Sequence, residues 1–132
     1  MSEAPLVFVV DDEPEIVALV ALQLKASSLR VLQFTSSAAA RLALRTERPD
    51  LMICDLQLPG EGGERVLREC RGVAPGAQLI ILTAAGEAER ARAREQGLAD
   101  AVLEKPWHRE ELLRLVHLML GLETRSPPPP GA

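Results

Sequence analysis

The sequence predicts an α/β fold in which five parallel strands form one sheet with helices on both faces. Short apolar runs alternate five times with segments of helical periodicity, and this order is typical of strands joined by right-handed helical crossovers. Four of the runs are apolar throughout, as expected of strands that are buried on both faces. A length of 132 residues suffices for one domain with an aliphatic core.

Each predicted strand stops at a polar residue. The run from Leu51 to Cys54 stops at Asp55, and a Pro-Gly step soon after it predicts a loop. The second strand, Leu29–Phe34, is mixed in polarity, so we expect it at or near a sheet edge. The remaining predicted strands are Leu6–Val10, Leu79–Leu82 and Ala101–Leu103.

A helix is predicted after each strand. Asp12 or Glu13 is a candidate cap for the first helix, and Ser36 or Ser37 for the second. A Gly-rich loop, 60–63, precedes the third. The predicted helices are Glu15–Ala26, a segment that ends near Thr46, Glu64–Arg71, Glu87–Gln96 and Arg109–Leu120.

The last two predicted helices differ in how much apolar surface they offer. In the fourth, only alanines such as Ala88 and Ala91 are available to face the core, so we expect this helix to be the most loosely anchored. The fifth has more apolar residues than one packing stripe requires. This surplus predicts either a partner surface or an unusually apolar packing face.

Composition excludes several classes of protein. A net charge of −4 without clustered Lys or Arg argues against direct binding of nucleic acid or of an anionic membrane. Cys54 and Cys70 are too few for a disulfide framework or a zinc site, so both are expected to be reduced and buried. No secretion signal and no apolar run of about 18 residues is present. We therefore expect a cytoplasmic protein.

The chain is expected to comprise one domain and a short tail. Residues 1–122 hold all the predicted strands and helices. Residues 123–132 include four consecutive prolines, a composition typical of an extended spacer. The tail is predicted to be a linker, with an output domain beyond Ala132 as one possibility.

Polar side chains that can bind a metal or take part in a reaction follow four of the strands. Asp11 and Asp12 follow the first, Asp55 the third, Thr83 the fourth, and Lys105 lies at the end of the fifth. In the sheet order 2-1-3-4-5 the topology reverses between strands one and three, so acids from both strands face one crevice. Each residue alone has a simpler interpretation, as a helix cap, turn or surface residue, but their equivalent positions favour a common site.

Three carboxylates in one crevice require a compensating cation. Oxygen ligands without a nearby His or Cys favour Mg²⁺ or Mn²⁺ over zinc, and Mg²⁺ commonly binds one or two carboxylates together with a phosphate. A carboxylate such as Asp55 attacks a phosphoryl group once the transferring oxygens are neutralised, here by the metal and Lys105. Thr83 is expected to donate a hydrogen bond to the attached phosphoryl group.

Together these residues resemble the receiver domain of two-component response regulators. The matching stretches, in order across 6–122, are 9–13, 49–51, 55–60, 82–84 and 105–106. The resemblance implies a flavodoxin-like (βα)5 fold and a phosphoacceptor role for Asp55. It also implies a histidine kinase or phosphotransfer protein as donor, and slow self-hydrolysis of the acyl phosphate rather than turnover as an enzyme.

The resemblance further implies roles for the surrounding residues. Mg²⁺ is expected on Asp12, Asp55 and the backbone carbonyl of Gln57, with Asp11 acting through a water molecule. Thr83 and Lys105 are expected to contact the phosphoryl group. The surface of the fourth helix, fifth strand and fifth helix is expected to change on phosphorylation, and is a candidate for output contacts or a homodimer.

Two departures from the usual pattern of this family matter. Val102 lies where an aromatic switch residue is usual, so the familiar coupling through a rotating ring cannot operate in that form. Gln57 and Ala85 occupy positions that affect access of water to the phosphoryl group. The output route and the phosphate lifetime are therefore left open by the sequence.

Three other functions compete with this interpretation. A phosphatase with an aspartate nucleophile would want a second acid two residues after Asp55, where Gln57 stands. A flavodoxin-like cofactor module would present Asp11, Asp12 and Glu13 to a phosphate. A degenerate receiver that docks partners without phosphorylation is the third. His108 and His117 are interpreted as a helix-start residue and a solvated residue, and Arg90 as part of a solvated helix face.

Overall fold

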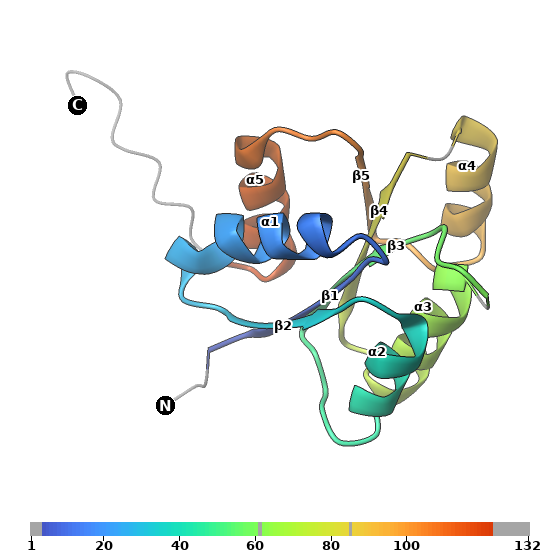
Figure 1. Cartoon of the computed structure of the whole chain (residues 1–132), viewed down its shortest axis with the longest axis horizontal. Helices are drawn as coiled ribbons and strands as arrows, with labels where there is room; N and C mark the ends of the chain where they lie inside the picture. Colours follow the sequence, from blue (N-terminus) through green and yellow to red (C-terminus); the bar gives the residue numbers. More distant parts are fainter. Residues whose placement is uncertain (1–3, 61, 85, 123–132) are drawn as a thin grey trace.

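A computed structural model of the chain describes residues 4–60, 62–84 and 86–122. Five parallel strands form one sheet in the order β2-β1-β3-β4-β5, with helices on both faces (Figure 1). The strands are β1 (Leu6–Val10), β2 (Arg30–Phe34), β3 (Leu51–Asp55), β4 (Gln78–Thr83) and β5 (Ala101–Glu104). The predicted fold class and strand order are confirmed, including the position of β2 at a sheet edge.

The strand register brings the ends of the strands to one edge of the sheet. Val10 pairs with Cys54 between β1 and β3, and Asp55 pairs with Leu82 between β3 and β4. The residues that follow these pairs therefore leave the sheet together. This edge is the one at which the sequence predicts a site.

Alternation along the strands divides the core into two layers. On one face, Phe8 and Met52 pack in a cluster with buried residues of the second, third and fourth helices. On the other face, Val9 and Ile53 pack against buried residues of α1 and α5. Because both faces are covered, the apolar runs of β1 and β3 are buried along their whole length.

The helices follow the predicted order with shifted ends. Their bounds are α1 (Pro14–Leu24), α2 (Ser37–Ala43), α3 (Gly62–Val73), α4 (Glu87–Glu95) and α5 (Arg109–Met119). A short 3-10 helix, Lys25–Ser27, follows α1. The second helix ends three residues before the predicted Thr46, because the chain tightens into a turn in which Arg48 Nη1 donates to the Leu44 carbonyl (2.7 Å).

The third helix begins earlier than predicted, within the expected Gly-rich loop. Gly62 has a φ of 75°, in the left-handed region that glycine adopts without strain. Gly63 packs directly on β3, and its amide donates to the Leu56 carbonyl (3.0 Å). These two glycines start the helix against the strand instead of extending the loop.

The caps of α1 and α2 differ from each other. Ser36 Oγ accepts a hydrogen bond from the Ala39 amide (3.1 Å), which confirms one of the two predicted caps of α2. Glu13 occupies the N-cap position of α1 without a capping hydrogen bond from its side chain. Glu13, one of the two predicted candidates, is therefore the cap residue by position, although its side chain makes no capping hydrogen bond.

The fourth helix is attached to the core through a single fully buried residue, Ala93. Ala88 is exposed and Ala91 is only half-buried. The prediction that these two residues face the core is therefore wrong, because a different side of the helix faces the sheet. A buried alanine removes little apolar area from water. The second helix also has a single buried residue, Ala40, but it packs against α3, β1 and β2, whereas α4 packs extensively against no other described element. The structure thus agrees with the expectation that α4 is the most loosely anchored helix.

The apolar surplus of the fifth helix is mostly explained by packing. Leu112 and Val116 are buried, and four further residues, Leu113, Leu115, Met119 and Leu120, pack partly buried against the same core layer. Leu118 is 71% exposed. The packing-face alternative is favoured over a partner surface made of these leucines.

Other sequence expectations concern isolated residues. Cys54 and Cys70 are both buried free thiols, and burial raises the pKa of Cys70 to about 11. His108 begins α5 as predicted, whereas His117 is half-buried and its Nε2 lies 2.9 Å from Ser27 Oγ. Among the described residues, no helix combines the length and apolarity required to cross a bilayer. The predicted tail lies outside the described residues.

Candidate functional site

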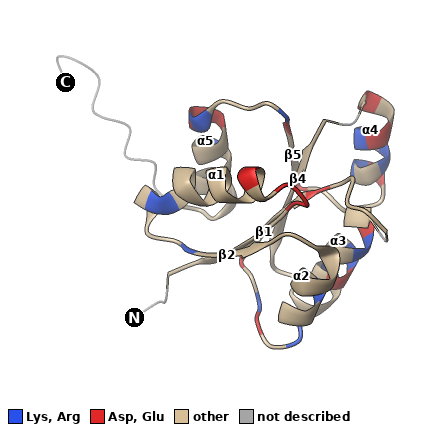
Figure 2. Cartoon of the chain, in the orientation of Figure 1, with Lys and Arg blue, Asp and Glu red and all other residues tan. Residues whose placement is uncertain are grey.

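Three carboxylates meet at the carboxyl edge of the sheet. Asp11 and Asp12 follow β1, and Asp55 ends β3. Figure 2 shows the acidic positions at these two strand ends close together. One carboxylate oxygen from each residue lies within 4.8 Å of the other two. The predicted convergence of the acids is therefore present in the structure.

Lys105 bridges two of these acids. Its Nζ lies 2.8 Å from Asp11 Oδ2 and 3.2 Å from Asp55 Oδ2. The Lys105 amide donates to the Thr83 carbonyl (3.0 Å), which fixes the turn after β5 against the end of β4. The lysine predicted from its strand-end position thus lies in the same site.

Backbone amides hold the other carboxylate oxygens in place. Asp11 Oδ1 accepts from the Glu13 amide (2.9 Å), and Asp55 Oδ1 accepts from the Gln57 amide (2.9 Å). In both cases the carboxylate bonds the amide two residues ahead, a local turn that Asp favours. The remaining oxygen of each, Oδ2, is directed to Lys105, while Asp12 is exposed.

The burial of this cluster changes its titration. Burial raises the pKa of Asp11 above its usual range, and the charge of Asp55 adds to that rise, although Lys105 and the Glu13 amide oppose it. Burial also acts to lower the pKa of Lys105, but its close ion pairs with the carboxylates of Asp11 and Asp55 outweigh this effect and raise it. Lys105 is consequently a permanent cation of the site.

The donor set fits a hard divalent cation. Asp11, Asp12 and Asp55 supply oxygen donors only, and a single ammonium does not balance three carboxylates. Asp11 Oδ2 is buried and, among the described residues, meets the ammonium of Lys105 without a hydrogen bond of good geometry. A buried carboxylate oxygen without a hydrogen bond is suited to a cation or to its bound water.

Thr83 belongs to the same edge. It is fully buried at the end of β4. Together with Lys105 it lines a small polar cavity of about 140 Å³, whose other walls are Ala84, Arg90 and Glu104. The predicted site residues Asp11, Asp12, Asp55, Thr83 and Lys105 therefore all lie at this edge.

Gln57 makes two contacts, one through its backbone amide and one through its side chain. Its amide bonds Asp55, as described above, and its side-chain Nε2 donates to Glu89 Oε2 of α4 (3.2 Å). The loop after β3 is thereby connected to the loosely held helix. Ala85, the other residue predicted to affect water access, lies outside the described residues.

Two residues near the site, Glu13 and Arg90, make contacts that were not predicted from the sequence. Glu13 Oε2 lies 3.4 Å from Lys105 Nζ and adds a fourth carboxylate at the rim. Arg90, predicted to lie on a solvated face, has a side chain only 14% exposed and forms ion pairs with Glu87 and Glu104. The i,i+3 spacing of Glu87 and Arg90 is the one sequence signal that points to part of this arrangement.

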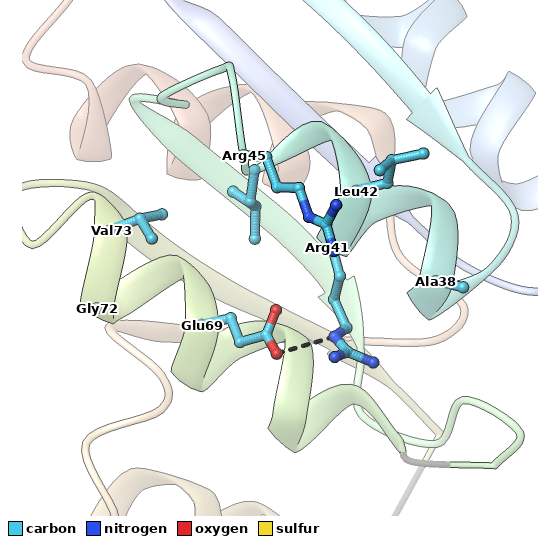
Figure 3. Close-up of a pocket in the computed structure, with 8 residues that line it drawn as sticks. Ala38, Arg41, Leu42, Arg45, Glu69, Gly72 and Val73 are labelled. Atoms are coloured by element: carbon cyan, nitrogen blue, oxygen red, sulfur yellow. Dashed lines mark hydrogen bonds and ion pairs between the residues drawn. The ribbon is translucent and has the colours of Figure 1, made fainter.

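A larger hollow lies elsewhere on the described surface. It is an open groove of about 710 Å³ between α2 and α3, with residues such as Leu42, Arg45 and Val73 along it. Figure 3 shows Arg41 reaching across the groove to Glu69, with an Nε–Oε1 distance of 2.9 Å. None of the acids at the sheet edge lines this groove, so cavity size does not identify the site.

Comparison with known proteins assigns the chain to a family. Residues 7–117 match the response regulator receiver domain. TcrX of Mycobacterium tuberculosis, a probable transcriptional regulatory protein, is 31% identical over 86% of this chain and 49% of its own length. PhoB of Rhizobium meliloti, a phosphate regulon transcriptional regulatory protein, is 35% identical over 88% of this chain and 52% of its own.

A solved structure has the same fold. The receiver domain of DrrB from Thermotoga maritima, in a BeF3-activated form, superimposes with a TM-score of 0.80 at 25% identity and covers 89% of this chain and 98% of that one. The chain spans about half the length of TcrX and PhoB. The family match, together with the acids, lysine and threonine at the sheet edge, shows that this chain belongs to the receiver domain family of two-component response regulators.

Proposed function

We propose that the chain is a Mg²⁺-dependent phosphoacceptor that receives a phosphoryl group on Asp55. The observation that carries this proposal is the Lys105 ammonium, which lies between Asp55 and Asp11 while Asp12 lies at the rim. Receiver domains are signalling modules that work with histidine kinases. A histidine kinase or a phosphotransfer protein is accordingly the proposed donor.

The transfer exchanges one bond to phosphorus for another. An Asp55 carboxylate oxygen forms the new O–P bond, while the P–N bond of a donor phosphohistidine breaks and its electron pair stays on the imidazole nitrogen. Asp11, Asp12, Asp55 and the Gln57 carbonyl are the groups proposed to hold Mg²⁺, Asp11 through a water molecule. The ion would neutralise charge on the transferring oxygens.

The remaining residues position the group and compensate its charge. The Lys105 ammonium already contacts Asp55 and supplies positive charge without moving far. Thr83 lines the cavity beside Lys105, so its hydroxyl is suited to donate a hydrogen bond to a phosphoryl oxygen. Both groups are fixed by the paired ends of β4 and β5.

An apolar hollow beside the site supports an approach route for the donor. Ile16, Leu19, Pro106 and Trp107 line it together with Lys105, and its volume is about 260 Å³. Leu19 is 41% exposed, and Leu22, one turn further along α1, is 67% exposed. We propose that the phosphodonor docks here. Leu19→Asp is expected to slow transfer from the donor protein while leaving labelling by acetyl phosphate unchanged.

Output remains a proposal at the surface of α4, β5 and α5, through a homodimer or a further domain beyond Ala132. Two observations support it: α4 is weakly anchored, and transcriptional regulators such as TcrX and PhoB are about twice as long as this chain. A cytoplasmic location and the Pro-rich linker at 123–132 also stay predictions.

Labelling with acetyl phosphate tests the proposed function. Intact-mass measurement is expected to show a single phosphoryl adduct in the presence of Mg²⁺, and no adduct in Asp55→Asn with an unchanged circular dichroism spectrum. An equal adduct in Asp55→Asn would overturn the assignment. Steady hydrolysis of a phosphate monoester would favour the phosphatase alternative. Mg²⁺-dependent quenching of Trp107 without any adduct would favour a docking module.

A further inference from the structure

Arg90 is a cation beside the proposed phosphoryl site, and it is not among the residues that the proposed function uses. Its side chain lines the same 140 Å³ cavity as Thr83 and Lys105, although it belongs to α4 and not to a strand end. Among the described residues, Lys105 and Arg90 are the cations that line this cavity. A phosphoryl group held by Thr83 and Lys105 would therefore share a small polar space with the guanidinium.

The present partners of Arg90 hold it weakly. Its Nη2 lies 2.8 Å from Glu87 Oε2, and its Nη1 pairs with Glu104. The Glu87 and Glu104 side chains are 71% and 64% exposed, and ion pairs with such exposed carboxylates contribute little because water and salt screen them. By contrast, arginine binds phosphate with short, charge-assisted and often bidentate hydrogen bonds.

One donor of Arg90 has no acceptor. Arg90 Nε is buried and makes no hydrogen bond within the described part of the chain. A buried donor without an acceptor costs free energy, and an acceptor placed in the cavity would relieve that cost. The oxygens of a phosphoryl group are acceptors of this kind.

Arg90 also pairs with a residue on the strand that carries the departure from the family pattern. Val102 and Glu104 lie two residues apart on β5 and so share one face of the strand. Val102 packs partly buried against the core layer that also contains Ala93 of α4. The ion pair with Glu104 connects Arg90 to this strand, on which Val102 is smaller than the aromatic residue usual in the family.

From these contacts we infer that Arg90 is a positioning residue that connects the phosphoryl site to α4. When a phosphoryl group enters the cavity, the guanidinium exchanges the Glu104 carboxylate for phosphoryl oxygens. Because Arg90 lies on a helix whose only buried residue is Ala93, this exchange moves α4 relative to β5. The inference rests on the proposed function of Asp55 and adds the route by which its occupancy reaches the surface.

Beryllofluoride with Mg²⁺ is a suitable probe, because it mimics an attached phosphoryl group without a covalent step and activates the related DrrB receiver. Binding is followed by Trp107 fluorescence or calorimetry, and α4 by hydrogen exchange of its backbone amides. Arg90→Gln and Glu104→Gln are compared with Arg92→Gln, which removes the same charge from an exposed position on α4.

Arg90→Gln is expected to weaken beryllofluoride binding about tenfold and to abolish the exchange response of α4. Arg92→Gln is expected to bind and respond as the unmodified chain does. Glu104→Gln is the decisive variant. If the guanidinium leaves Glu104 on binding, removing that carboxylate tightens binding. If the pair only anchors α4, Glu104→Gln weakens binding as Arg90→Gln does, and the inference is overturned.

The outcomes separate this inference from the proposed function. Unaltered binding and an unaltered α4 response in Arg90→Gln would overturn the role of Arg90 alone. Equal losses of beryllofluoride binding in Arg90→Gln and Arg92→Gln would show that only net charge matters, and would also overturn the inference about Arg90. Failure of the unmodified chain to bind beryllofluoride through Asp55 would instead refute the proposed function.

Discussion

Lys105 Nζ lies 3.2 Å from Asp55 Oδ2, although the two residues are 50 positions apart in the chain. The same ammonium lies 2.8 Å from Asp11 Oδ2. These two contacts tie the ends of β1, β3 and β5 together across the sheet edge. They hold two carboxylates side by side that would otherwise repel each other.

Replacing Lys105 is expected to lower the stability of the folded chain and to strengthen Mg²⁺ binding. In Lys105→Met, the buried Asp11 carboxylate loses its partner, so the free energy of unfolding without metal falls by about 3 kcal/mol. Mg²⁺ then binds more tightly, because no ammonium competes for the carboxylates. Phosphorylation by acetyl phosphate slows by about tenfold to a hundredfold. Urea denaturation and calorimetry measure these effects, and looser Mg²⁺ binding would contradict the account.

Mg²⁺ is expected to stabilise the folded chain in proportion to its occupancy. At a concentration one hundred times the Kd, linkage gives about 2.7 kcal/mol of added stability, seen as a rise in Tm. Asp12→Asn removes one of the three acids and relieves repulsion, so its metal-free form should unfold at a higher temperature. Its response to Mg²⁺ should be largely lost, and an unchanged response would exclude Asp12 as a ligand.

Two glycines of α3 form a matched pair for testing how closely the helix packs on β3. A Cβ on Gly63 would lie 2.1 Å from the Asp55 carbonyl oxygen, whereas one on Gly72 would meet nothing within 4 Å. Gly63→Ala is expected to destabilise the fold by about 3 kcal/mol or more and to impair phosphorylation. Gly72→Ala should raise stability by about 0.5 kcal/mol. Denaturation midpoints compare them, and a neutral Gly63→Ala would contradict the packing.

Stability is expected to fall at alkaline pH because of the buried thiols. Burial raises the pKa of Cys70 to about 11 and raises that of Cys54 well above its usual range. Above pH 9 the unfolded chain loses thiol protons that the folded chain keeps, so unfolding becomes more favourable by about 1.4 kcal/mol per pH unit and thiol. Cys70→Ala should halve this slope between pH 9 and 10, and an unchanged slope would contradict the assignment.

The strands and the site acids were predictable for a common physical reason. A strand buried on both faces is an unbroken apolar run, as in Leu51–Cys54, and its first polar residue marks the sheet edge. Parallel strands place those residues together, so Asp11, Asp55 and Lys105 were identified without contact information. The order of the strands does not follow from this pattern alone, because other doubly wound sheets share the same alternation; it was expected from the flavodoxin-like fold that the resemblance implies, and the structure has it.

Features that depend on side-chain contacts were not predictable. Alanines at three positions of α4 are equally apolar, so the sequence does not specify that Ala93 is the buried one. Arg90 occurs in an alternating Arg-Ala segment that is typical of a solvated helix, and only its pairing with Glu104 on β5 places it at the site. Gly63 suggested a loop because its close approach to Asp55 is a tertiary contact.

Chemical mapping of the acyl phosphate tests the central claim most directly. The chain is treated with acetyl phosphate and Mg²⁺, then with borohydride, which reduces an aspartyl phosphate to homoserine, and its peptides are sequenced by tandem mass spectrometry. Homoserine at position 55, and its loss when EDTA removes Mg²⁺, is the predicted result. Homoserine at position 11 or 12, or equal modification of Asp55 without Mg²⁺, would contradict the account.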